Sequence, residues 1–182
     1  MPIAPPQSSS RSHNYAIVTA IMAIPFGPSN ISVYGGRSNY SDAGLAMNLP
    51  QTGGCQCGKI RYEIAEAPQL VYTCHCKDCQ RLTSSAFSLR IVVVESAVRL
   101  SGIEPRALQR MADSGRTNTR WVCPECGSWV CSPPRDGMMR VRAGTLDDTS
   151  WLRPTRHIWT RSKQPWVMFF EGEEIFEAQP PA

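Results

Sequence analysis

The stretch Cys-His-Cys-Lys-Asp-Cys at residues 74–79 places three of the chain's eight cysteines within six positions. One cysteine pair precedes this stretch, in Cys-Gln-Cys at 55–57, and another follows it, in Cys-Pro-Glu-Cys at 123–126. Only Cys131 lies outside these groups. Cysteines one or two residues apart are poorly placed to form disulfides with one another, but they converge readily on one metal ion. The spacing therefore predicts zinc sites rather than four disulfide bonds.

Length and composition limit the class of protein. The chain has 182 residues, of which 42% are hydrophobic and 19% charged, so it can form one domain with a sizeable core and is not disordered as a whole. The longest apolar run, residues 15–26, is shorter than the roughly 20 residues that span a bilayer. The net charge of +4 is spread along the chain without a basic patch. We therefore expect neither a membrane nor a nucleic acid as a partner.

Residues 1–46 differ in composition from the rest of the chain. They are rich in Ser, Pro, Ala, Gly and Asn, contain no cysteine, and show no complete targeting signature. We predict that they form a disordered or mis-started N-terminal extension, with Met47 as the alternative initiator, and that residues 47–182 form the zinc-binding domain. We expect a cytoplasmic protein, although import into an organelle by the extension stays open.

From Thr52 onward the pattern favours short strands separated by turns. Within residues 60–64, Ile60, Tyr62 and Ile64 alternate with charged residues, which is typical of a half-buried strand. The other predicted strands are 70–73, 86–94, 98–101, 120–123, 128–132, 139–143 and 166–170. Helical periodicity is weak, and one short helical turn is expected after Cys79. We therefore predict a mostly β domain with little helix.

The two cysteine pairs predict a structural metal site. Cys55, Cys57, Cys123 and Cys126 supply four thiolates from two distant turns, which a sheet can bring together. Four ligands close a tetrahedral zinc site, so nothing can react there.

The group Cys74, Cys76 and Cys79 supplies only three thiolates, and zinc prefers four ligands. A position for water or substrate would then stay open. His75 and Cys131 are the alternative fourth ligands: His75 is expected to point away, and Cys131 to be a buried free cysteine. Three thiolates make the zinc complex anionic and favour a soft incoming ligand such as a thiol, which would be held as a thiolate. The reaction class that follows is thiolate attack on an aldehyde carbonyl, or its reversal.

The motifs resemble those of the glutathione-dependent formaldehyde-activating enzyme family, which includes centromere protein V. The matching cysteine segments are 54–58, 74–79 and 123–127. Further matches are Ala86-Phe87, Gly-Thr-Leu-Asp-Asp at 144–148, and residues 154–166 with His157, Trp159, Lys163 and Trp166. The resemblance implies a β-tent fold of packed antiparallel sheets. It also implies two zinc ions per chain, one structural on Cys55, Cys57, Cys123 and Cys126, and one catalytic on Cys74, Cys76 and Cys79.

The activity that the resemblance implies is a carbon–sulfur lyase reaction, the condensation of formaldehyde with glutathione to S-hydroxymethylglutathione. The expected partner is therefore a small thiol–aldehyde adduct. A non-catalytic zinc module that binds another protein is the alternative function, and a redox-sensing thiol site is a third. The oligomeric state stays unassigned.

Substrate-binding residues also stay unassigned, because each remaining candidate has an ordinary structural explanation. His157 can bind substrate or be a strand histidine that is satisfied by the backbone. Four tryptophans can line a pocket or pack in the core: Trp129, Trp151, Trp159 and Trp166. Asp147 and Asp148 can orient a loop. Arg116 and Arg120 can bind a carboxylate of the substrate or lie on a solvated face of the hairpin.

Overall fold

The computed structural model describes residues 47–112 and 115–181. The predicted extension, residues 1–46, lies outside the described residues. In the part of the chain that is described, no helix is long and apolar enough to cross a membrane. The described residues form a mostly β fold with one short α-helix, as predicted.

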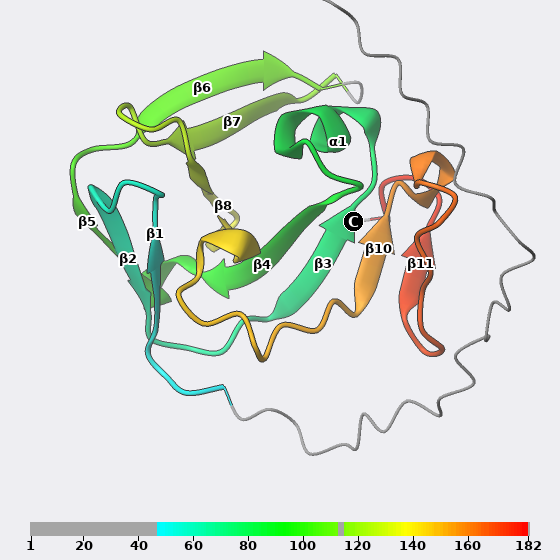
Figure 1. Cartoon of the computed structure of the whole chain (residues 1–182), viewed down its shortest axis with the longest axis horizontal. Helices are drawn as coiled ribbons and strands as arrows, with labels where there is room; N and C mark the ends of the chain where they lie inside the picture. Colours follow the sequence, from blue (N-terminus) through cyan, green and yellow to red (C-terminus); the bar gives the residue numbers. More distant parts are fainter. Residues whose placement is uncertain (1–46, 113–114, 182) are drawn as a thin grey trace, which may run out of the picture. The chain divides into compact units, whose positions relative to one another are not determined.

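A large mixed sheet and a small antiparallel sheet make up this fold (Figure 1). The large sheet has the strand order β11-β10-β3-β4-β9-β8-β7-β6. Its strands are β3 (Leu70–Cys74), β4 (Ser88–Val94), β6 (Arg106–Met111), β7 (Thr117–Val122), β8 (Trp129–Arg135), β9 (Met138–Arg142), β10 (Arg156–Ile158) and β11 (Glu174–Phe176). The small sheet has the order β1-β2-β5, from β1 (Gln51–Gly54), β2 (Ile60–Ile64) and β5 (Val98–Gly102). Pairing is antiparallel throughout, except that β10 runs parallel to both of its neighbours.

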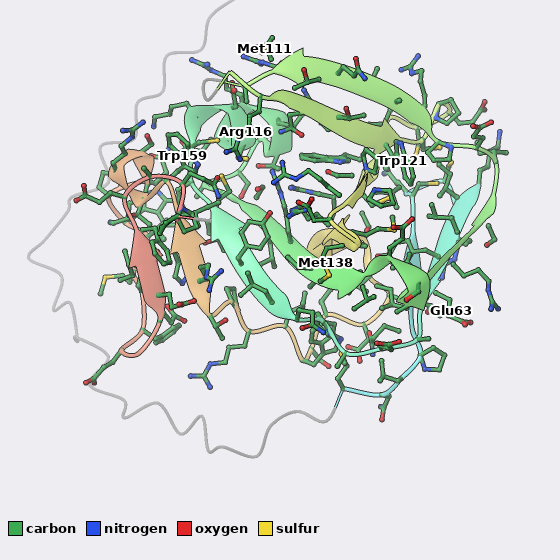
Figure 2. All side chains as sticks on the ribbon, turned by 180° about the vertical axis from the view of Figure 1, so that it is seen from behind. Glu63, Met111, Arg116, Trp121, Met138 and Trp159 are labelled. Carbon is green, nitrogen blue, oxygen red and sulfur yellow. The ribbon has the colours of Figure 1, made fainter. Side chains whose placement is uncertain are left out.

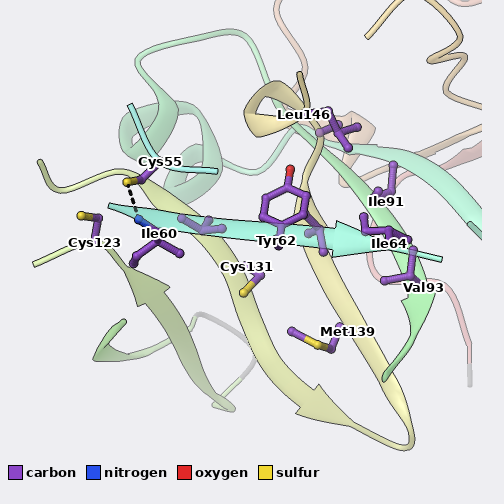
Figure 3. Packing of buried hydrophobic residues seen from close by; sticks show 13 residues of the cluster. Cys55, Ile60, Tyr62, Ile64, Ile91, Val93, Cys123, Cys131, Met139 and Leu146 are labelled. Carbon is purple, nitrogen blue, oxygen red and sulfur yellow. Dashed lines mark hydrogen bonds between the residues drawn. The ribbon is translucent and has the colours of Figure 1, made fainter. Parts of the chain in front are cut away.

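The main core lies between the small sheet and one face of the large sheet (Figure 3). Ile60, Tyr62 and Ile64 of β2 are buried, while Arg61 and Glu63 between them are not, so the alternation in the sequence marks the core face correctly. The buried members of this cluster are Cys55, Ile60, Tyr62, Ile64, Ile91, Val93, Cys123, Val130, Cys131, Met139, Val141, Ala143 and Leu146.

Most predicted strands are confirmed within two or three residues, and residues 120–123 and 128–132 do belong to a hairpin, β7–β8. The strand predicted at 166–170 is wrong. The segment lies in the connection between β10 and β11 and pairs with neither of them, because β10 pairs with β3 and β11 instead. Its residues Trp166, Met168 and Phe170 are exposed instead.

The helix α1 (Lys77–Thr83) begins before Cys79 rather than after it. Cys76 is its N-cap residue, and the Cys76 sulfur accepts a hydrogen bond from the Cys79 amide at 3.4 Å. Sulfur thus fills the capping role that Ser or Asp usually has. The strands that the sequence did not predict are β1, β6, β10 and β11, which are short or, in the case of β6, exposed along their whole length.

The close approach of β5 to the start of β2 at Gly102 leaves no room for a side chain. Gly102 ends β5 with φ +88°, and a Cβ there would overlap the Lys59 carbonyl oxygen. Gly137, between β8 and β9, has φ +70° and open space around it. A left-handed non-glycine residue costs about 1–2 kcal/mol, and overpacking adds about 1–3 kcal/mol. We expect Gly102→Ala to lower the free energy of unfolding in urea clearly more than the matched Gly137→Ala. Equal losses would contradict the close packing at Lys59.

Candidate functional site

The first cysteine group joins the two sheets. Cys55 and Cys57 lie in the turn between β1 and β2, and Cys123 and Cys126 lie in the turn between β7 and β8. The four Sγ atoms lie within 4.8 Å of one another. The Cys55–Cys57 and Cys57–Cys123 sulfur distances are 3.5 and 3.7 Å. These distances fit the roughly 3.8 Å edge of a tetrahedron with zinc–sulfur bonds of about 2.3 Å.

Hydrogen bonds to two sulfurs of this group favour the thiolate form. The Ile60 amide donates to the Cys55 sulfur at 3.2 Å (dashed in Figure 3), and the Ser128 hydroxyl lies 3.2 Å from the Cys126 sulfur. The bond from Ser128 lowers the pKa of Cys126 to about 5. Lys59 and Glu125 form an ion pair at 2.7 Å between the two turns. The donor set therefore suits a closed structural metal site.

The second cysteine group is built by the end of β3 and the start of α1. Cys74 is the last residue of β3, Cys76 caps the helix, and Cys79 lies in its first turn. Their three sulfurs also lie within 4.8 Å of one another. Hydrogen bonds from the Cys74 and Cys76 thiols lower the pKa of Cys79 well below its usual range, and the positive charge of Arg90 adds to this effect.

Neither alternative fourth ligand belongs to this second group. His75 is fully buried, with its Nε2 2.9 Å from the Thr73 hydroxyl, and burial lowers the pKa of His75 to about 4, so the ring is neutral. Cys131 lies in the core, where it is 1% exposed, and burial raises its pKa to about 12. Figure 3 shows Cys131 near Tyr62 and Met139, away from Cys55 and Cys123. Within the described residues, the group therefore offers three cysteine sulfurs to a metal ion.

The histidines instead belong to a buried hydrogen-bond network that the sequence did not reveal. His157 Nδ1 lies 2.6 Å from the Thr73 hydroxyl, and its Nε2 lies 2.9 Å from Glu173 Oε2. The side chains of His157 and Glu173 are each 8% exposed. Phe169 stacks on His157 and meets His75 edge-on. The partners of the His157 side chain are thus Thr73 and Glu173, not backbone groups, and only their meeting in three dimensions identifies them.

Register explains why this network and the cysteines do not meet. Cross-strand partners point to the same face of a sheet, and successive residues to opposite faces. His157 is the partner of Thr73, whereas Ile158 is the partner of Cys74. The network therefore lies on the opposite face of the sheet from the Cys74 side chain.

A cleft of about 560 Å³ opens on the Cys74 face of the large sheet. Residues of β3, β4, β8 and β9 line its floor, and α1, the start of β7 and the region around Trp159 line its walls. All three cysteines of the second group border this cleft. Figure 2 shows Arg116 and Trp159, which also line it, beside α1. Trp159 has a left-handed backbone with φ 59°, an uncommon conformation for a bulky residue.

Residues that pair with one another across adjacent strands form rows over the floor of the cleft. Cys74 pairs with Ser88 at the cysteine end. The next row reads Arg156, Tyr72, Arg90 and Arg142 across β10, β3, β4 and β9. The row after it reads Leu70, Val92, Arg140 and Ser132 across β3, β4, β9 and β8. Arginines therefore begin one row away from the cysteines.

Arg90 connects the arginine row to the second cysteine group. Its Nη2 donates to the Cys79 sulfur at 3.2 Å and its Nη1 to the Tyr72 hydroxyl at 3.3 Å. Burial opposes the charge of Arg90, but Tyr72, Cys79 and Cys74 raise its pKa above the usual value. Arg90 is therefore a fixed cation beside the cysteines.

The ring of Trp129 lies against the guanidinium groups of three arginines. The guanidinium carbons of Arg90, Arg120 and Arg142 lie 5.0, 5.6 and 4.2 Å from its ring centroid, within reach of cation–π attraction. Burial, and then the charge of Arg90, lower the pKa of Arg142 to about 10. The prediction of Arg120 as a solvated residue is therefore wrong, because it lies half-buried over this ring.

The cleft as a whole is strongly cationic. Its lining includes Arg90, Arg116, Arg135, Arg140 and Arg156, whereas its acidic side chains are limited, among the described residues, to Asp78. Asp78 is itself paired with Arg110 at 2.9 Å. Such a cleft suits an anionic ligand.

The remaining candidates hold loops in place. Asp147 accepts hydrogen bonds from Arg61 and from the Thr52 hydroxyl, and Asp148 accepts one from the Ser150 amide at 2.9 Å. Trp151 donates to Gln51 Oε1 at 2.9 Å. Trp166 is 71% exposed and forms no part of the core. These residues are not candidates for the chemistry.

Fold and site together define a mostly β domain with two cysteine groups suited to metal ions, one of them open to a cationic cleft. The model of the family described as "Glutathione-dependent formaldehyde-activating enzyme" matches residues 50–162, and the chain belongs to this family. No curated protein sequence matches the chain. A crystal structure of a Rhodobacter sphaeroides protein resembles it with a TM-score of 0.43 and 17% identity, over 69% of this chain and 98% of that one. At that TM-score, nothing about this chain follows from the likeness.

The different surroundings of the eight cysteines predict different effects on metal content. We expect two zinc ions per chain in the unaltered protein, measured by plasma mass spectrometry after dialysis. Cys76→Ser should leave one zinc and an unchanged circular dichroism spectrum, because the four-cysteine group still joins the sheets. Cys123→Ser should lose the other zinc and much of the stability, since structural zinc contributes directly to folding.

Cys131→Ala is the matched control. It should keep both zinc ions and lose only about 1 kcal/mol of stability from a small core cavity. Loss of a zinc ion from Cys131→Ala, or retention of both by Cys76→Ser, would contradict the assignment of ligands.

Proposed function

We propose that residues 47–182 form a zinc-dependent carbon–sulfur lyase that acts on the adduct of glutathione and formaldehyde. The observation that carries this proposal is the three-cysteine group at the end of an arginine-lined cleft. Membership of the glutathione-dependent formaldehyde-activating enzyme family supports the choice of substrates.

In this proposal Cys74, Cys76 and Cys79 would hold a catalytic zinc, while the four-cysteine group would hold a structural one. Zinc bound to the three cysteines would favour the thiolate form of an incoming thiol. In the overall reaction, the glutathione sulfur forms a bond to the formaldehyde carbon, the carbonyl π pair moves to oxygen, and that oxygen takes up one proton. The reverse reaction breaks the carbon–sulfur bond and returns the proton.

The chain's own residues contribute charge and shape to this reaction. Arg90 is the fixed cation beside Cys79, where it offsets the negative charge of clustered thiolates. Ile158 and Trp159 line the cleft next to the cysteines and present an apolar wall. Glutathione carries two carboxylates and one ammonium group at neutral pH, so its net negative charge suits the cationic cleft.

The state of the thiols supports a proposal for the compartment. All eight cysteines are free, which suits the reducing conditions of the cytoplasm. We therefore propose a cytoplasmic enzyme with small-molecule substrates, and neither a nucleic acid nor a membrane as a partner.

One observation favours the alternative, a zinc module that binds another protein. Trp166, Met168 and Phe170 are 71%, 85% and 65% exposed along one short segment. Exposed apolar residues gathered in this way are typical of protein interaction sites. A module of this kind needs no open metal position, so the enzyme remains the function that the three-cysteine group supports best.

Catalysis can be separated from the spontaneous reaction by exchange spectroscopy. Glutathione and formaldehyde form the adduct without an enzyme, so the exchange rate between free glutathione and adduct is measured by NMR with and without the zinc-loaded protein. We expect the protein to accelerate this exchange, Cys76→Ser to lose at least 100-fold of the effect, and Cys131→Ala to keep it, in line with loss of a metal-based catalyst. No acceleration above the spontaneous rate would reject formaldehyde and glutathione as substrates.

A further inference from the structure

Three of the five arginines in the cleft already have partners. Arg90 is bonded to Cys79 and Tyr72. Arg156 pairs with Glu174 at 2.6 Å, and Arg135 pairs with Asp136 at 3.3 Å. These pairs leave Arg116 and Arg140, of which Arg116 lies on the exposed rim.

Arg140 is the arginine that lines the cleft floor and has no partner among the described residues. It is half-buried on β9, and within the described residues it has no ion pair and no side-chain hydrogen bond. Its cross-strand neighbours are Val92 on β4 and Ser132 on β8. Ser132 lines the same cleft and adds a hydroxyl donor beside the guanidinium. A guanidinium with an adjacent hydroxyl matches the geometry of a carboxylate.

The position of Arg140 suits the far end of a small peptide. It lies two rows from the Cys74–Ser88 row, which is four residues or about 13 Å along the strands. It also lies two strands across from β3, about 10 Å away, so the two offsets combine to about 16 Å between the backbones of Cys74 and Arg140. The long side chain of arginine closes much of this gap, and an extended tripeptide spans roughly 10 Å. A peptide with its sulfur at the cysteines can therefore place a terminal carboxylate near Arg140.

We propose that Arg140, with the Ser132 hydroxyl, is a carboxylate-binding subsite that selects acidic, tripeptide-sized thiols over small neutral ones. The inference rests on the proposed function for the thiol itself, because glutathione is a thiol of that size with a carboxylate at each end. Arg90 stays bound to the cysteine group and offsets the thiolate charge there. Arg140 binds the substrate carboxylate that lies away from the cysteines.

The test measures recognition of the carboxylate separately from thiol binding at the metal and from the reaction with formaldehyde. S-methylglutathione keeps both carboxylates but has no free thiol, so its binding does not depend on the reaction. We expect Arg140→Gln to weaken its binding, measured by calorimetry with the zinc-loaded protein, at least 10-fold, and Arg140→Lys to weaken it less because the charge remains. The diethyl ester of S-methylglutathione should bind the unaltered protein and Arg140→Gln equally weakly.

Arg99→Gln is the matched control, because Arg99 lies exposed on β5 of the small sheet, outside the cleft lining. It should bind S-methylglutathione like the unaltered protein. Circular dichroism and zinc content are checked for every variant, and Arg140→Lys is the second variant if Arg140→Gln does not fold.

The kinetic counterpart is a higher KM for glutathione in Arg140→Gln with kcat little changed, since the subsite acts on binding rather than on the reacting atoms. Unchanged binding of S-methylglutathione by Arg140→Gln would overturn the subsite even if the protein accelerates the exchange with formaldehyde. An equal loss for the acid and its diethyl ester would also overturn it. Conversely, the expected binding pattern in a protein without formaldehyde activity would support the subsite and reject the proposed reaction.

Discussion

The four-cysteine group is the constraint on which the rest of the structure depends. It joins the turn between β1 and β2 of the small sheet to the turn between β7 and β8 of the large one. Cys55 and Cys123 are also members of the buried core, so the same side chains close the metal group and pack between the sheets. Thiolates this close repel one another unless a cation compensates them, and a bound metal ion would supply that charge. The four-cysteine group therefore brings the two sheets together at a position that suits a metal ion.

The large sheet then separates packing from chemistry, because alternate residues of each strand point to opposite faces. On β4, Ile91 and Val93 enter the core while Arg90 and Val92 face the cleft. The core face carries aliphatic side chains, which stabilise the domain by burial. The cleft face carries arginines that would be unfavourable there without aromatic platforms and nearby thiolates. One sheet thus supports a stable core and an electrostatically specialised cleft.

How much of this could be predicted from the sequence depends on the range of each signal. The alternation in β2 and the hairpin around Cys123 and Cys126 are local, and both predictions are confirmed. The strand predicted at 166–170 is wrong because apolar residues in a row do not reveal whether their segment pairs with a neighbouring strand or stays exposed. The helix α1 was placed too late, since a cysteine sulfur rather than the usual hydroxyl or carboxylate caps it. The partnership of His157 with Thr73 and Glu173 joins three distant segments and leaves no local pattern.

By itself the sequence determined the number and grouping of the cysteines, the β character of the domain and the family to which it belongs. These properties follow from spacing and periodicity, which are local. Only the tertiary structure decided that Cys131 and His75 stay out of the metal groups, and that arginines from β4, β9 and β10 line one cleft beside Cys74, Cys76 and Cys79. The reason is physical: the face on which a side chain emerges is set by strand register, and register is fixed by pairing between residues far apart in the chain.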